Sequence, residues 1–339
     1  MTEHQSMPFV QVKDLRKTYQ IRRGLFGRAQ ALDAVAGVSF ELEQGSTFGL
    51  VGESGSGKST IAKLLMMAES PSAGTVTING RNLASMNERE KHDFRKQVQP
   101  VLQDPYSALN PRMRIGRIID EPLRIHKALP DEAALNLRVS ELLDLVGLPR
   151  DAGSRFPHEL SGGQRQRVSI ARTLGVNPSF MILDEPVSAL DVSIQAQILN
   201  LLKDLQDKLK LTYLLISHDL AVVAYMSQRV GVLYLGQFME IADTEDIVSH
   251  ARHPYTQALL ASVNARSGIE GTMEVSGEIP SPMNPPSGCP FHPRCPMAQE
   301  RCASEKPMLR KLESRHWIAC HFAEEISALT LTTGEKNYV

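Results

Sequence analysis

A segment near the start of the chain has residue types and spacing that suit the binding of a triphosphate. It follows the pattern G-x4-G-K-S/T and consists of Gly52, Glu53, Ser54, Gly55, Ser56, Gly57, Lys58, Ser59 and Thr60. Glycine lets the backbone approach a ligand, so the N–H groups of this loop and of the following helix would point at an anion. We expect Lys58 to reach the β- and γ-phosphates of ATP, Ser59 to bind Mg²⁺ and Thr60 to add a phosphate contact.

Two adjacent carboxylates end an apolar segment further along the chain. Residues 179–184 read Ser-Phe-Met-Ile-Leu-Asp, which is typical of a buried parallel strand that delivers its last residue to the carboxyl edge of a sheet. We expect this strand to lie beside the strand of residues 46–51, which leads into the phosphate-binding segment. Asp184 would then hold Mg²⁺ through water, and Glu185 would polarise the attacking water as a general base.

The hydrophobic pattern places these motifs in an α/β fold. Residues 9–80 alternate in the manner of strands, apart from a helix predicted over 58–67, and residues 105–174 are mostly helical. Strands and helices alternate over residues 180–235, which is typical of a parallel sheet. One helix in this region carries apolar side chains at helical spacing, namely Ile194, Ile198, Leu201, Leu202 and Leu205.

Length and composition argue against several other classes of protein. The 339 residues suit two domains, or one large domain with an appendage, and a hydrophobic content of 42% supports a substantial core. A net charge of −1 argues against a nucleic-acid partner bound through its phosphates. No uninterrupted run of about 18 apolar residues predicts a membrane span, and the N-terminus lacks a secretion signal. We therefore expect a protein that is made and kept in the cytosol.

The segment 160–164, Leu-Ser-Gly-Gly-Gln, resembles the signature motif of the ATP-binding cassette (ABC) transporter ATPases. The resemblance implies an α/β fold of the ABC nucleotide-binding type, with a RecA-like parallel sheet core, an antiparallel β subdomain and a helical subdomain. It also implies that the motif begins a helix and binds the γ-phosphate of ATP held by a second subunit, so that two chains enclose two nucleotides. The residues implied in this contact are Ser161, Gly162, Gly163 and Gln164.

Other residues stand where this family places its functional parts. Tyr19 matches the aromatic side chain that stacks on adenine, and Gln103 matches the glutamine that senses Mg²⁺ and the γ-phosphate. Asp191 matches the loop that crosses the dimer interface, and His218 matches the histidine that touches the γ-phosphate. The catalytic residues implied are Gln103, Glu185 and His218. The Mg²⁺ ligands implied are Ser59, Gln103 and Asp184.

The sequence departs from the family pattern at two positions that carry no chemistry. Val187 stands where threonine is common after Asp-Glu-Pro, and Pro100 interrupts the strand that ends at Gln103. Because every catalytic position is intact, we expect a subunit that hydrolyses ATP at its own site, rather than a regulatory subunit with a dead site.

The four cysteines of the chain lie together near its end. They are Cys289, Cys295, Cys302 and Cys320, with the spacing C-x5-C-x6-C-x17-C. In a cytosolic protein such clustering favours metal or redox chemistry over disulfides. Four thiolates suit either Zn²⁺ or a 4Fe–4S cluster, and reduced structural thiols are a third interpretation. The wide spacing favours the cluster, because zinc sites usually contain a close C-x2–4-C pair. His292 and His321 lie nearby and are alternative ligands.

The same region strengthens the resemblance. Residues 253–260 and 288–296, with the cysteines that follow, are similar to the C-terminal region of oligopeptide/dipeptide importer ATPases. That resemblance implies a 4Fe–4S cluster held by the four cysteines. It divides the chain into an ABC ATPase domain over residues 1–250, with a helical subdomain at about 105–175, and a C-terminal region over 251–339.

The resemblance implies an ATP-hydrolysing subunit that powers the import of dipeptides or oligopeptides. Its partners would be a second ATPase subunit, expected to be a paralogue, two transmembrane permease subunits and, through them, an extracytoplasmic solute-binding protein. The chain would lie on the cytoplasmic face of a bacterial membrane, and the surface around Gln103 and Tyr106 would receive a short permease helix. An importer for nickel or a glutathione-like peptide is the alternative, and a soluble ABC ATPase outside transport is a remote one.

Overall fold

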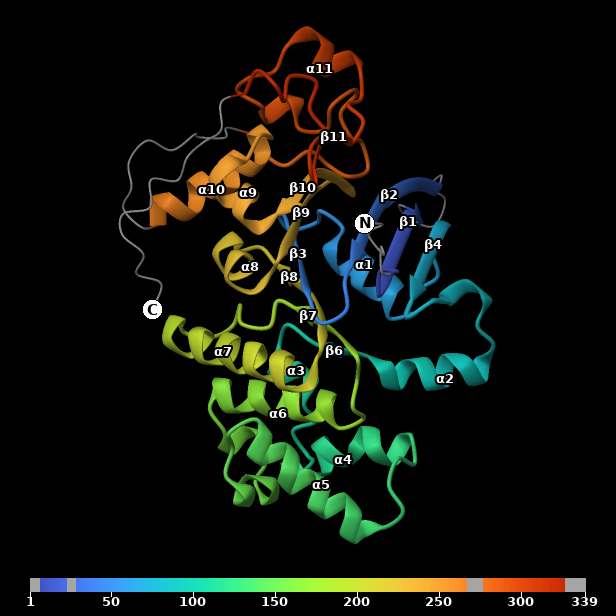
Figure 1. Ribbon diagram of the computed structural model, residues 1–339, viewed down its shortest axis with the longest axis vertical. Helices are drawn as coiled ribbons and strands as arrows, with labels where there is room; N and C mark the ends of the chain where they lie inside the picture. The colour runs from blue at the N-terminus through green and yellow to red at the C-terminus, as the bar shows by residue number, and fades with distance from the viewer. Residues whose placement is uncertain (1–6, 23–28, 267–276, 327–339) are drawn as a thin grey trace, which may run out of the picture.

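The computed structural model describes residues 7–22, 29–266 and 277–326 and contains two sheets flanked by helices (Figure 1). The strands of the larger sheet are β3 (Thr47–Val51), β6 (Val98–Val101), β7 (Phe180–Asp184), β8 (Thr212–Ser217), β9 (Arg229–Tyr234), β10 (Gln237–Asp243), β11 (Arg310–Glu313) and β12 (His316–Ile318). They lie side by side in the order β11-β12-β10-β9-β3-β8-β7-β6.

The centre of this sheet is parallel and buried on both faces. β3 pairs in parallel with β8 and β9, and β7 pairs in parallel with β6 and β8. Alternation along β7 sends Phe180 and Ile182 to one hydrophobic cluster, and Met181 and Leu183 to another. Because both faces are covered, the strand sequences are apolar runs without polar alternation.

The strand order corrects one prediction from the sequence. The sequence analysis expects the strand that ends in Asp184 to lie beside β3, and this is wrong, because β8 lies between β3 and β7 and pairs with both. A parallel strand returns through a crossover, and the apolar run of a buried strand does not specify which neighbour it takes. The order brings the end of β8, and His218 after it, between the phosphate-binding loop and the two carboxylates.

The position of β6 explains how the fold accommodates Pro100. Within the described residues, β6 is the last strand of the sheet, with β7 as its neighbour. A residue without an N–H is tolerated at such an edge, because one side of the strand makes no ladder hydrogen bonds. The proline therefore leaves β6 continuous from Val98 to Val101.

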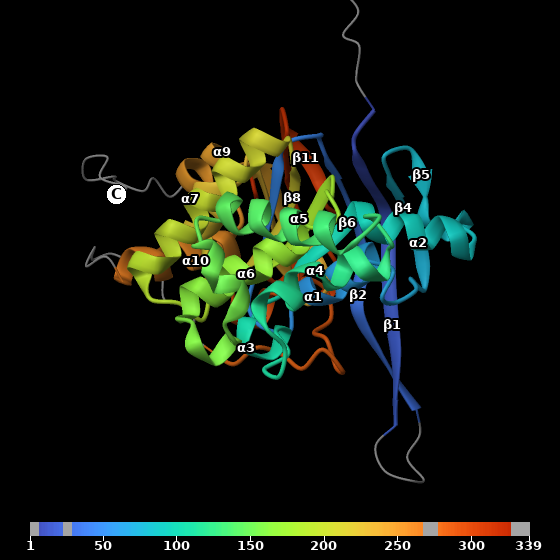
Figure 2. The same cartoon turned by 90° about the horizontal axis from the view of Figure 1, so that it is seen from below.

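The smaller sheet is antiparallel and packs on the larger one. It is formed by β1 (Val10–Arg22), β2 (Ala29–Leu42), β4 (Ala73–Ile78) and β5 (Arg81–Asn82). Their order is β2-β1-β4-β5, and Figure 2 shows the long β1–β2 hairpin projecting from the molecule. Phe40 of β2 stacks on Phe48 of β3, with ring centroids 5.0 Å apart, which joins the two sheets through one hydrophobic cluster.

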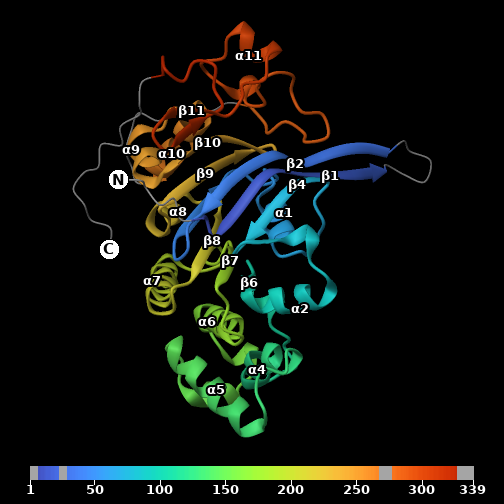
Figure 3. The same ribbon diagram turned by 45° about the vertical axis from the view of Figure 1, so that its right-hand side comes forward.

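The helices flank the sheets and also form one end of the molecule. They are α1 (Lys58–Leu65), α2 (Glu88–Gln97), α3 (Pro105–Ala108), α4 (Ile115–Ile125), α5 (Glu132–Leu145), α6 (Gly162–Leu174), α7 (Val192–Leu209), α8 (Leu220–Met226), α9 (Thr244–His250), α10 (Pro254–Arg266) and α11 (Glu300–Ser304). Short 3-10 helices are η1 (Leu83–Ser85), η2 (Arg150–Ser154), η3 (Pro157–Glu159) and η4 (His292–Arg294). Figures 1 and 3 show α4, α5 and α6 gathered at the end opposite α11, which confirms the predicted helical segment before β7.

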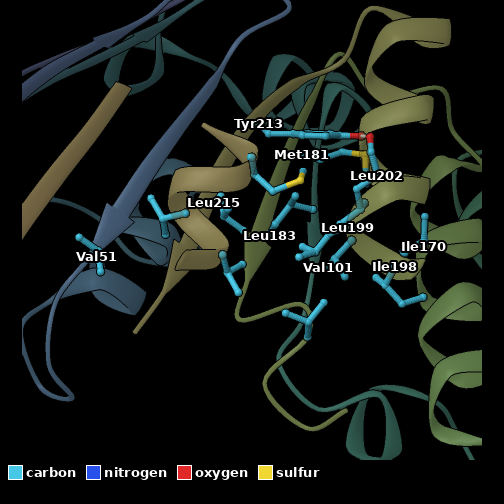
Figure 4. Packing of buried hydrophobic residues seen from close by; sticks show 14 of the residues in the cluster. Val51, Val101, Ile170, Met181, Leu183, Ile198, Leu199, Leu202, Tyr213 and Leu215 are labelled. Carbon is cyan, nitrogen blue, oxygen red and sulfur yellow. Dashed lines mark hydrogen bonds between the residues drawn. The ribbon is translucent and has the colours of Figure 1, made fainter. Parts of the chain in front are cut away.

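One face of the parallel strands packs against α6 and α7. Met181 and Leu183 of β7 lie beside Leu199 and Leu202 of α7, as Figure 4 shows. The hydroxyl of Tyr213 donates a 3.0 Å hydrogen bond to the carbonyl of Leu202, so the one polar atom of this buried ring has a partner. This packing fixes the positions of β7 and β8, and so of their carboxyl ends, against α7.

The C-terminal region extends the larger sheet. β12 pairs with β10, and β11 pairs with β12, both antiparallel. Between β12 and β10, Nε2 of His316 and Oε1 of Glu240 lie 2.7 Å apart, and the two side chains are 3% and 0% exposed. The division of the chain near residue 250 stays a prediction. The larger sheet contains strands from both sides of that position.

Candidate active site

The phosphate-binding loop joins β3 to α1 and is built around glycines. Gly57 has a φ of 107°, and a Cβ atom there would lie 2.4 Å from the carbonyl oxygen of Ala34. A Cβ atom on Gly52 would lie 2.1 Å from the carbonyl oxygen of Leu233. Side chains at these positions would collide with backbone, so the loop keeps its shape only with glycine. No side chain caps the N-terminus of α1, whose first N–H groups therefore stay available for an anion.

Lys58 lies folded against this loop. Its Nζ atom donates to the carbonyl oxygens of Gly52 at 2.6 Å and Glu53 at 2.9 Å, and the residue is only 6% exposed. Burial lowers the pKa of Lys58, whereas the negative charges of Glu185, Asp184 and Glu53 act in the opposite direction. The lysine is thus the cation around which the acidic residues of the site are arranged.

Asp184 and Ser59 place two oxygen atoms that could ligate a metal ion beside Lys58. Burial and the charge of Glu185 raise the pKa of Asp184, whereas Lys58 and a hydrogen bond from the Ser59 hydroxyl oppose that rise. A carboxylate and a hydroxyl are ligands that Mg²⁺ prefers, and a bound cation would relieve the repulsion between the two carboxylates. The residues present therefore fit the ion that the sequence predicts here.

Glu185 sits at the meeting point of three segments. Its backbone has a φ of 47°, and its N–H donates a 2.9 Å hydrogen bond to the carbonyl of Ile216 in β8. Nε2 of Gln103 donates to Oε2 of Glu185 at 2.8 Å, and Nδ1 of His218 lies 3.2 Å from Oε1. The structure thus brings together the three residues that the sequence analysis names as catalytic. A left-handed φ is uncommon for glutamate.

The glycine-rich signature segment lies apart from this site within the chain. Ser161 caps α6 through a reciprocal pair of hydrogen bonds with Gln164, as predicted for a motif that begins a helix. A Cβ atom on Gly163 would lie 2.5 Å from Cγ2 of Ile194 in α7, so α6 approaches α7 closely there. Ser161 is exposed, and Figures 1 and 3 show α6 separated from α1.

One glutamine side chain forms hydrogen bonds with the segment between β7 and α7. Nε2 of Gln195 donates to the carbonyl oxygens of Val187 at 3.1 Å and Leu190 at 2.9 Å. Val187 is buried at 4% exposure, which explains an apolar residue at this position. Asp191 is exposed at the start of α7, and its side chain makes no capping hydrogen bond. Its contact with a partner subunit stays a prediction.

Tyr19 lies on β1 at the edge of the same site. Its hydroxyl donates to a carboxylate oxygen of Glu69, just beyond α1, and Lys17 Nζ lies 5.0 Å from the ring centroid. Burial raises the pKa of Tyr19, as does the Glu69 carboxylate, whereas a hydrogen bond with Thr60 of the phosphate-binding loop lowers it. The Tyr19 hydroxyl is therefore next to Thr60, and the role of the ring as a platform for adenine stays a prediction.

The sequence analysis missed the neighbours of Glu53. Arg294, far along the chain, donates to both carboxylate oxygens of Glu53, at 2.7 and 3.0 Å. The backbone N–H of Glu53 donates a 2.9 Å hydrogen bond to the hydroxyl of Tyr255. Both partners lie in the C-terminal region, so this region touches the phosphate-binding loop directly. No local pattern signals these contacts, although Tyr255 lies in a segment that the resemblance singles out.

The four cysteines line one cavity of about 20 Å³ in the C-terminal region. All four are free thiols, and Cys289 donates its backbone N–H to the carbonyl of Cys302 at 2.8 Å. Burial raises the pKa of Cys289 to about 12 and that of Cys295 to about 11. No three histidine, cysteine, aspartate or glutamate side chains in the described parts of the chain are spaced to hold a single metal ion.

Comparison with known proteins identifies the family. The family described as "ABC transporter" matches residues 35–188, and "Oligopeptide/dipeptide transporter, C-terminal region" matches residues 239–302. YkfD of Bacillus subtilis is 47% identical over 93% of this chain and 95% of its own length. The chain belongs to the ATP-binding proteins of ABC transporters. Two further relatives of this ABC protein are the oligopeptide transport ATP-binding protein AppF of Bacillus subtilis and the dipeptide transport ATP-binding protein DppF of Haemophilus influenzae. Both are 45% identical, over 95% and 93% of this chain and 99% and 97% of their own lengths.

A solved structure supports the same assignment for the ATPase core. The ATP-binding cassette MJ0796, in a dimeric post-hydrolysis state bound to ADP and phosphate, has a TM-score of 0.61 and 27% identity to this ABC protein. The match covers 69% of this chain and 98% of that protein. The ABC protein described here is thus an ATPase of the α/β class, as the sequence predicts. No helix in residues 7–22, 29–266 or 277–326 is both long and apolar enough to cross a membrane.

Proposed function

We propose that this chain is the ATP-hydrolysing subunit of a membrane importer for dipeptides or oligopeptides. The observation that carries the proposal is the convergence of Gln103 and His218 on Glu185, beside a complete phosphate-binding loop. Similarity over nearly the whole chain to AppF and DppF, whose names specify oligopeptide and dipeptide transport, supports peptides as the cargo.

The chain's own residues have distinct roles in hydrolysis. The N–H groups of the phosphate-binding loop bind the triphosphate, and Lys58 turns from its backbone partners toward the β- and γ-phosphates. Ser59 and Asp184 would hold Mg²⁺, which neutralises phosphate charge when bound. Glu185 orients the attacking water and accepts its proton, while Gln103 and His218 fix the carboxylate.

A second ATPase subunit completes each site in this proposal. Ser161 at the start of α6 is exposed, and Figure 3 shows α6 apart from α1, which suits contact with a nucleotide held by a partner. The dimeric state of MJ0796 supports this arrangement. The full assembly would contain two ATPase chains, expected to be paralogues, two permease subunits and an extracytoplasmic binding protein, with this chain on the cytoplasmic face of the membrane.

Trapping the closed dimer tests the proposed hydrolysis mechanism. Glu185→Gln keeps the shape of the side chain but removes the base, so ATP would bind without turnover. Mixed with its partner ATPase and Mg-ATP, this variant should form a stable two-chain species with ATP retained, as measured by light scattering and nucleotide analysis. Glu245→Gln, on the exposed face of α9, is the matched control and should turn over as the wild type does. Rapid hydrolysis by Glu185→Gln would reject the assignment.

Transport measurements distinguish peptides from other cargo. Cells that express the complete importer should accumulate labelled dipeptides or tetrapeptides, and the Glu185→Gln chain should abolish that uptake. Uptake of nickel or glutathione instead, dependent on the same glutamate, would replace the peptide assignment and leave the ATPase assignment intact.

We also propose that the four cysteines hold a 4Fe–4S cluster. The donor set fits: four thiols, two flanking η4, one in α11 and one just after β12, line one cavity whose other walls include His253 and Phe291. Bound there, the cluster would supply cross-links to a region that is too small to build a large core, as metals do for other small folds. Zinc and uncomplexed thiols remain the alternatives.

Metal analysis tests this second proposal without reference to activity. Protein isolated without oxygen should contain iron and sulfide and absorb visible light, and Cys295→Ser should lose most of the iron. Ser304→Ala, in α11 beside Cys302, is a control that leaves the cavity lining unchanged. Zinc in place of iron, or unchanged iron in Cys295→Ser, would contradict the ligand assignment.

A further inference from the structure

Glu53, which follows Gly52 in the phosphate-binding loop, forms an ion pair with a residue of the C-terminal region. The carboxylate of Glu53 accepts two hydrogen bonds from Arg294, at 2.7 and 3.0 Å, in a bidentate ion pair. The pair is largely shielded from water, because the Arg294 side chain is 9% exposed and that of Glu53 is 26% exposed. A bidentate pair with so little access to water restrains both position and orientation.

The surroundings of Arg294 keep its guanidinium in place. Its Nη1 atom lies 3.3 Å from the hydroxyl of Tyr234, at the end of β9. The guanidinium carbon lies 5.9 Å from the ring centroids of both Tyr234 and Phe291. These contacts come from the sheet on one side and from the cysteine-rich region on the other, so the arginine bridges the two.

Arg294 lies in the chain between two residues that line the four-cysteine cavity, His292 and Cys295. It is the last residue of η4 and directly precedes Cys295, and its N–H donates to the carbonyl of Phe291 at 3.0 Å. The carbonyl of Cys289 accepts from the N–H of His292, which begins the same turn. A single turn thus carries two of the cavity's cysteines at its ends and the arginine that reaches the phosphate-binding loop.

A second contact joins α10 to Glu53. The hydroxyl of Tyr255 accepts the backbone N–H of Glu53, and the Tyr255 ring is buried. That ring lies 5.2 Å from Phe291 and 4.7 Å from Tyr234, centroid to centroid. Both the backbone and the side chain of Glu53 therefore depend on residues packed around Phe291, in the wall of the cavity.

The position of Glu53 matters to the nucleotide for two reasons. Its carbonyl accepts a hydrogen bond from Lys58, so a shift of Glu53 moves the lysine that is aimed at the phosphates. Its carboxylate also lies close enough to Lys58 to influence it electrostatically. Without a cation beside it, that carboxylate would repel a bound triphosphate.

We propose that Arg294 is a positioning residue for the phosphate-binding loop, and that it transmits the state of the four-cysteine cavity to the affinity of the site for ATP. Arg294 neutralises Glu53 and holds it, and any change that displaces the turn before Cys295 moves the guanidinium. The inference rests on ATP binding at this loop, as proposed above. It adds a regulatory link between two regions that the sequence separates by 241 positions.

Binding of Mg-ATP to the full-length chain, measured by calorimetry, tests the positioning role. Arg294→Gln should weaken binding about tenfold, because it leaves the Glu53 carboxylate unneutralised. Glu53→Gln removes the negative charge and the bidentate restraint together, so it should weaken binding less than Arg294→Gln does, and the double variant should match the affinity of Glu53→Gln. Arg294→Lys, which keeps the charge but not the bidentate fork, should fall in between. A merely structural role would make the double variant at least as weak as Arg294→Gln.

The matched control is Arg301→Gln. Arg301 forms another bidentate pair of the C-terminal region, with Glu305 at 2.7 and 2.9 Å, and this pair lies far from the loop. This variant should bind ATP as the wild type does. Wild-type affinity in Arg294→Gln, with a normal melting temperature, would overturn the positioning role. If Arg294→Gln does not fold, Arg294→Lys and Glu53→Gln still decide the question. Failure of the wild-type chain to bind Mg-ATP would instead reject the proposed function.

A second measurement tests transmission from the cavity. Cys295→Ser should weaken Mg-ATP binding several-fold in the wild-type background and should have no further effect in the Arg294→Gln/Glu53→Gln chain, where the link is absent. An equal effect in both backgrounds would show that the cavity acts by another route. No effect in either background would show that the cavity does not communicate with the loop. Both of these results would overturn the proposed transmission.

Discussion

Nε2 of Gln103 and Oε2 of Glu185 are joined by a hydrogen bond of 2.8 Å. Gln103 follows β6, the edge strand, whereas Glu185 follows β7, so the bond ties the start of the helical end of the molecule to the proposed base. Tyr106, three residues on, lies under the guanidinium of Arg165 in α6, with 3.9 Å from its carbon to the ring centroid. A movement of α6 can thus reach Glu185 through one short segment.

Removal of the Gln103 amide should slow hydrolysis more than it weakens binding. In Gln103→Ala, Glu185 loses the donor that fixes its orientation, and we expect kcat to fall about 10- to 100-fold with KM for ATP nearly unchanged. Steady-state phosphate release measures both constants. Gln99→Ala, on the same β6 strand but bonded to Arg95, is the control. A rise in KM with normal kcat would assign Gln103 to nucleotide binding instead.

Gly163 should be indispensable for the contact between α6 and α7. In Gly163→Ala the added Cβ atom meets Cγ2 of Ile194 at 2.5 Å, and the stiff β-branched side chain cannot swing aside. The N-terminal turn of α6 must then shift, so we expect ATPase activity of the assembled pair to fall at least tenfold while a single chain binds ATP normally.

A compensating change provides the internal check on this prediction. Truncation in Gly163→Ala/Ile194→Ala makes room for the methyl group and should restore much of the activity. Loss of activity in the double variant equal to that in Gly163→Ala would show that the clash is not the cause.

Burial of His253 should make the folded state sensitive to acid. Desolvation lowers its pKa from 6.5 to about 4, although the Glu240 carboxylate and the carbonyl of Ala319 act in the opposite direction. The unfolded chain then binds more protons than the folded chain between these two pH values, so stability decreases as the pH falls from about 6.5 toward 4. The slope from this one group should reach about 1.4 kcal/mol per pH unit.

Urea unfolding at a series of pH values measures this slope. His253→Gln should reduce it in that window, even if the variant is less stable throughout. His250→Gln is the control, because the His250 side chain is 60% exposed. The same slope in His253→Gln and the wild type would contradict the assignment.

Glu240 should be the residue on which attachment of the C-terminal region depends most. It accepts the N–H groups of Arg252 at 2.8 Å and His253 at 3.1 Å and pairs with His316, and the side chains of Glu240 and both histidines are buried. Glu240→Ala leaves these partners unsatisfied, and we expect a loss of about 3–5 kcal/mol. Limited proteolysis should then cut the C-terminal region much faster. Glu313→Ala, on the exposed face of β11, should change little, and equal cleavage of both variants would refute the prediction.

The proposed catalytic residues came from two sources. Two carboxylates after an apolar strand are a short-range pattern, whereas Gln103 and His218 were named from the family resemblance, and the structure brings both of them to Glu185. The strand order was not predictable in the same way. β7 and β8 are both continuous apolar runs, and nothing in either run distinguishes the neighbour of β3 from the strand beyond it.

The contacts of Glu53 show a different limit. Its partner Arg294 is 241 positions away, and an arginine in a loop carries no sign of whether its charge is exposed or paired. The bidentate pair arises from the packing of Phe291 against Tyr234 and Tyr255, which depends on the complete fold. Sequence patterns and the family resemblance therefore predicted the residues of the site, whereas the restraint placed on the phosphate-binding loop required the structure.

The antiparallel pairing of β12 with β10 bears on any attempt to shorten this protein. A chain that stopped after α9 would strip β10 of its outer neighbour and leave a row of unsatisfied backbone donors and acceptors along a strand rich in apolar side chains. Open edges of that kind recruit strands from other molecules, so the shortened protein would be prone to precipitate. The cysteine-bearing segment thus also covers an edge of the larger sheet at which strands of other molecules would otherwise pair.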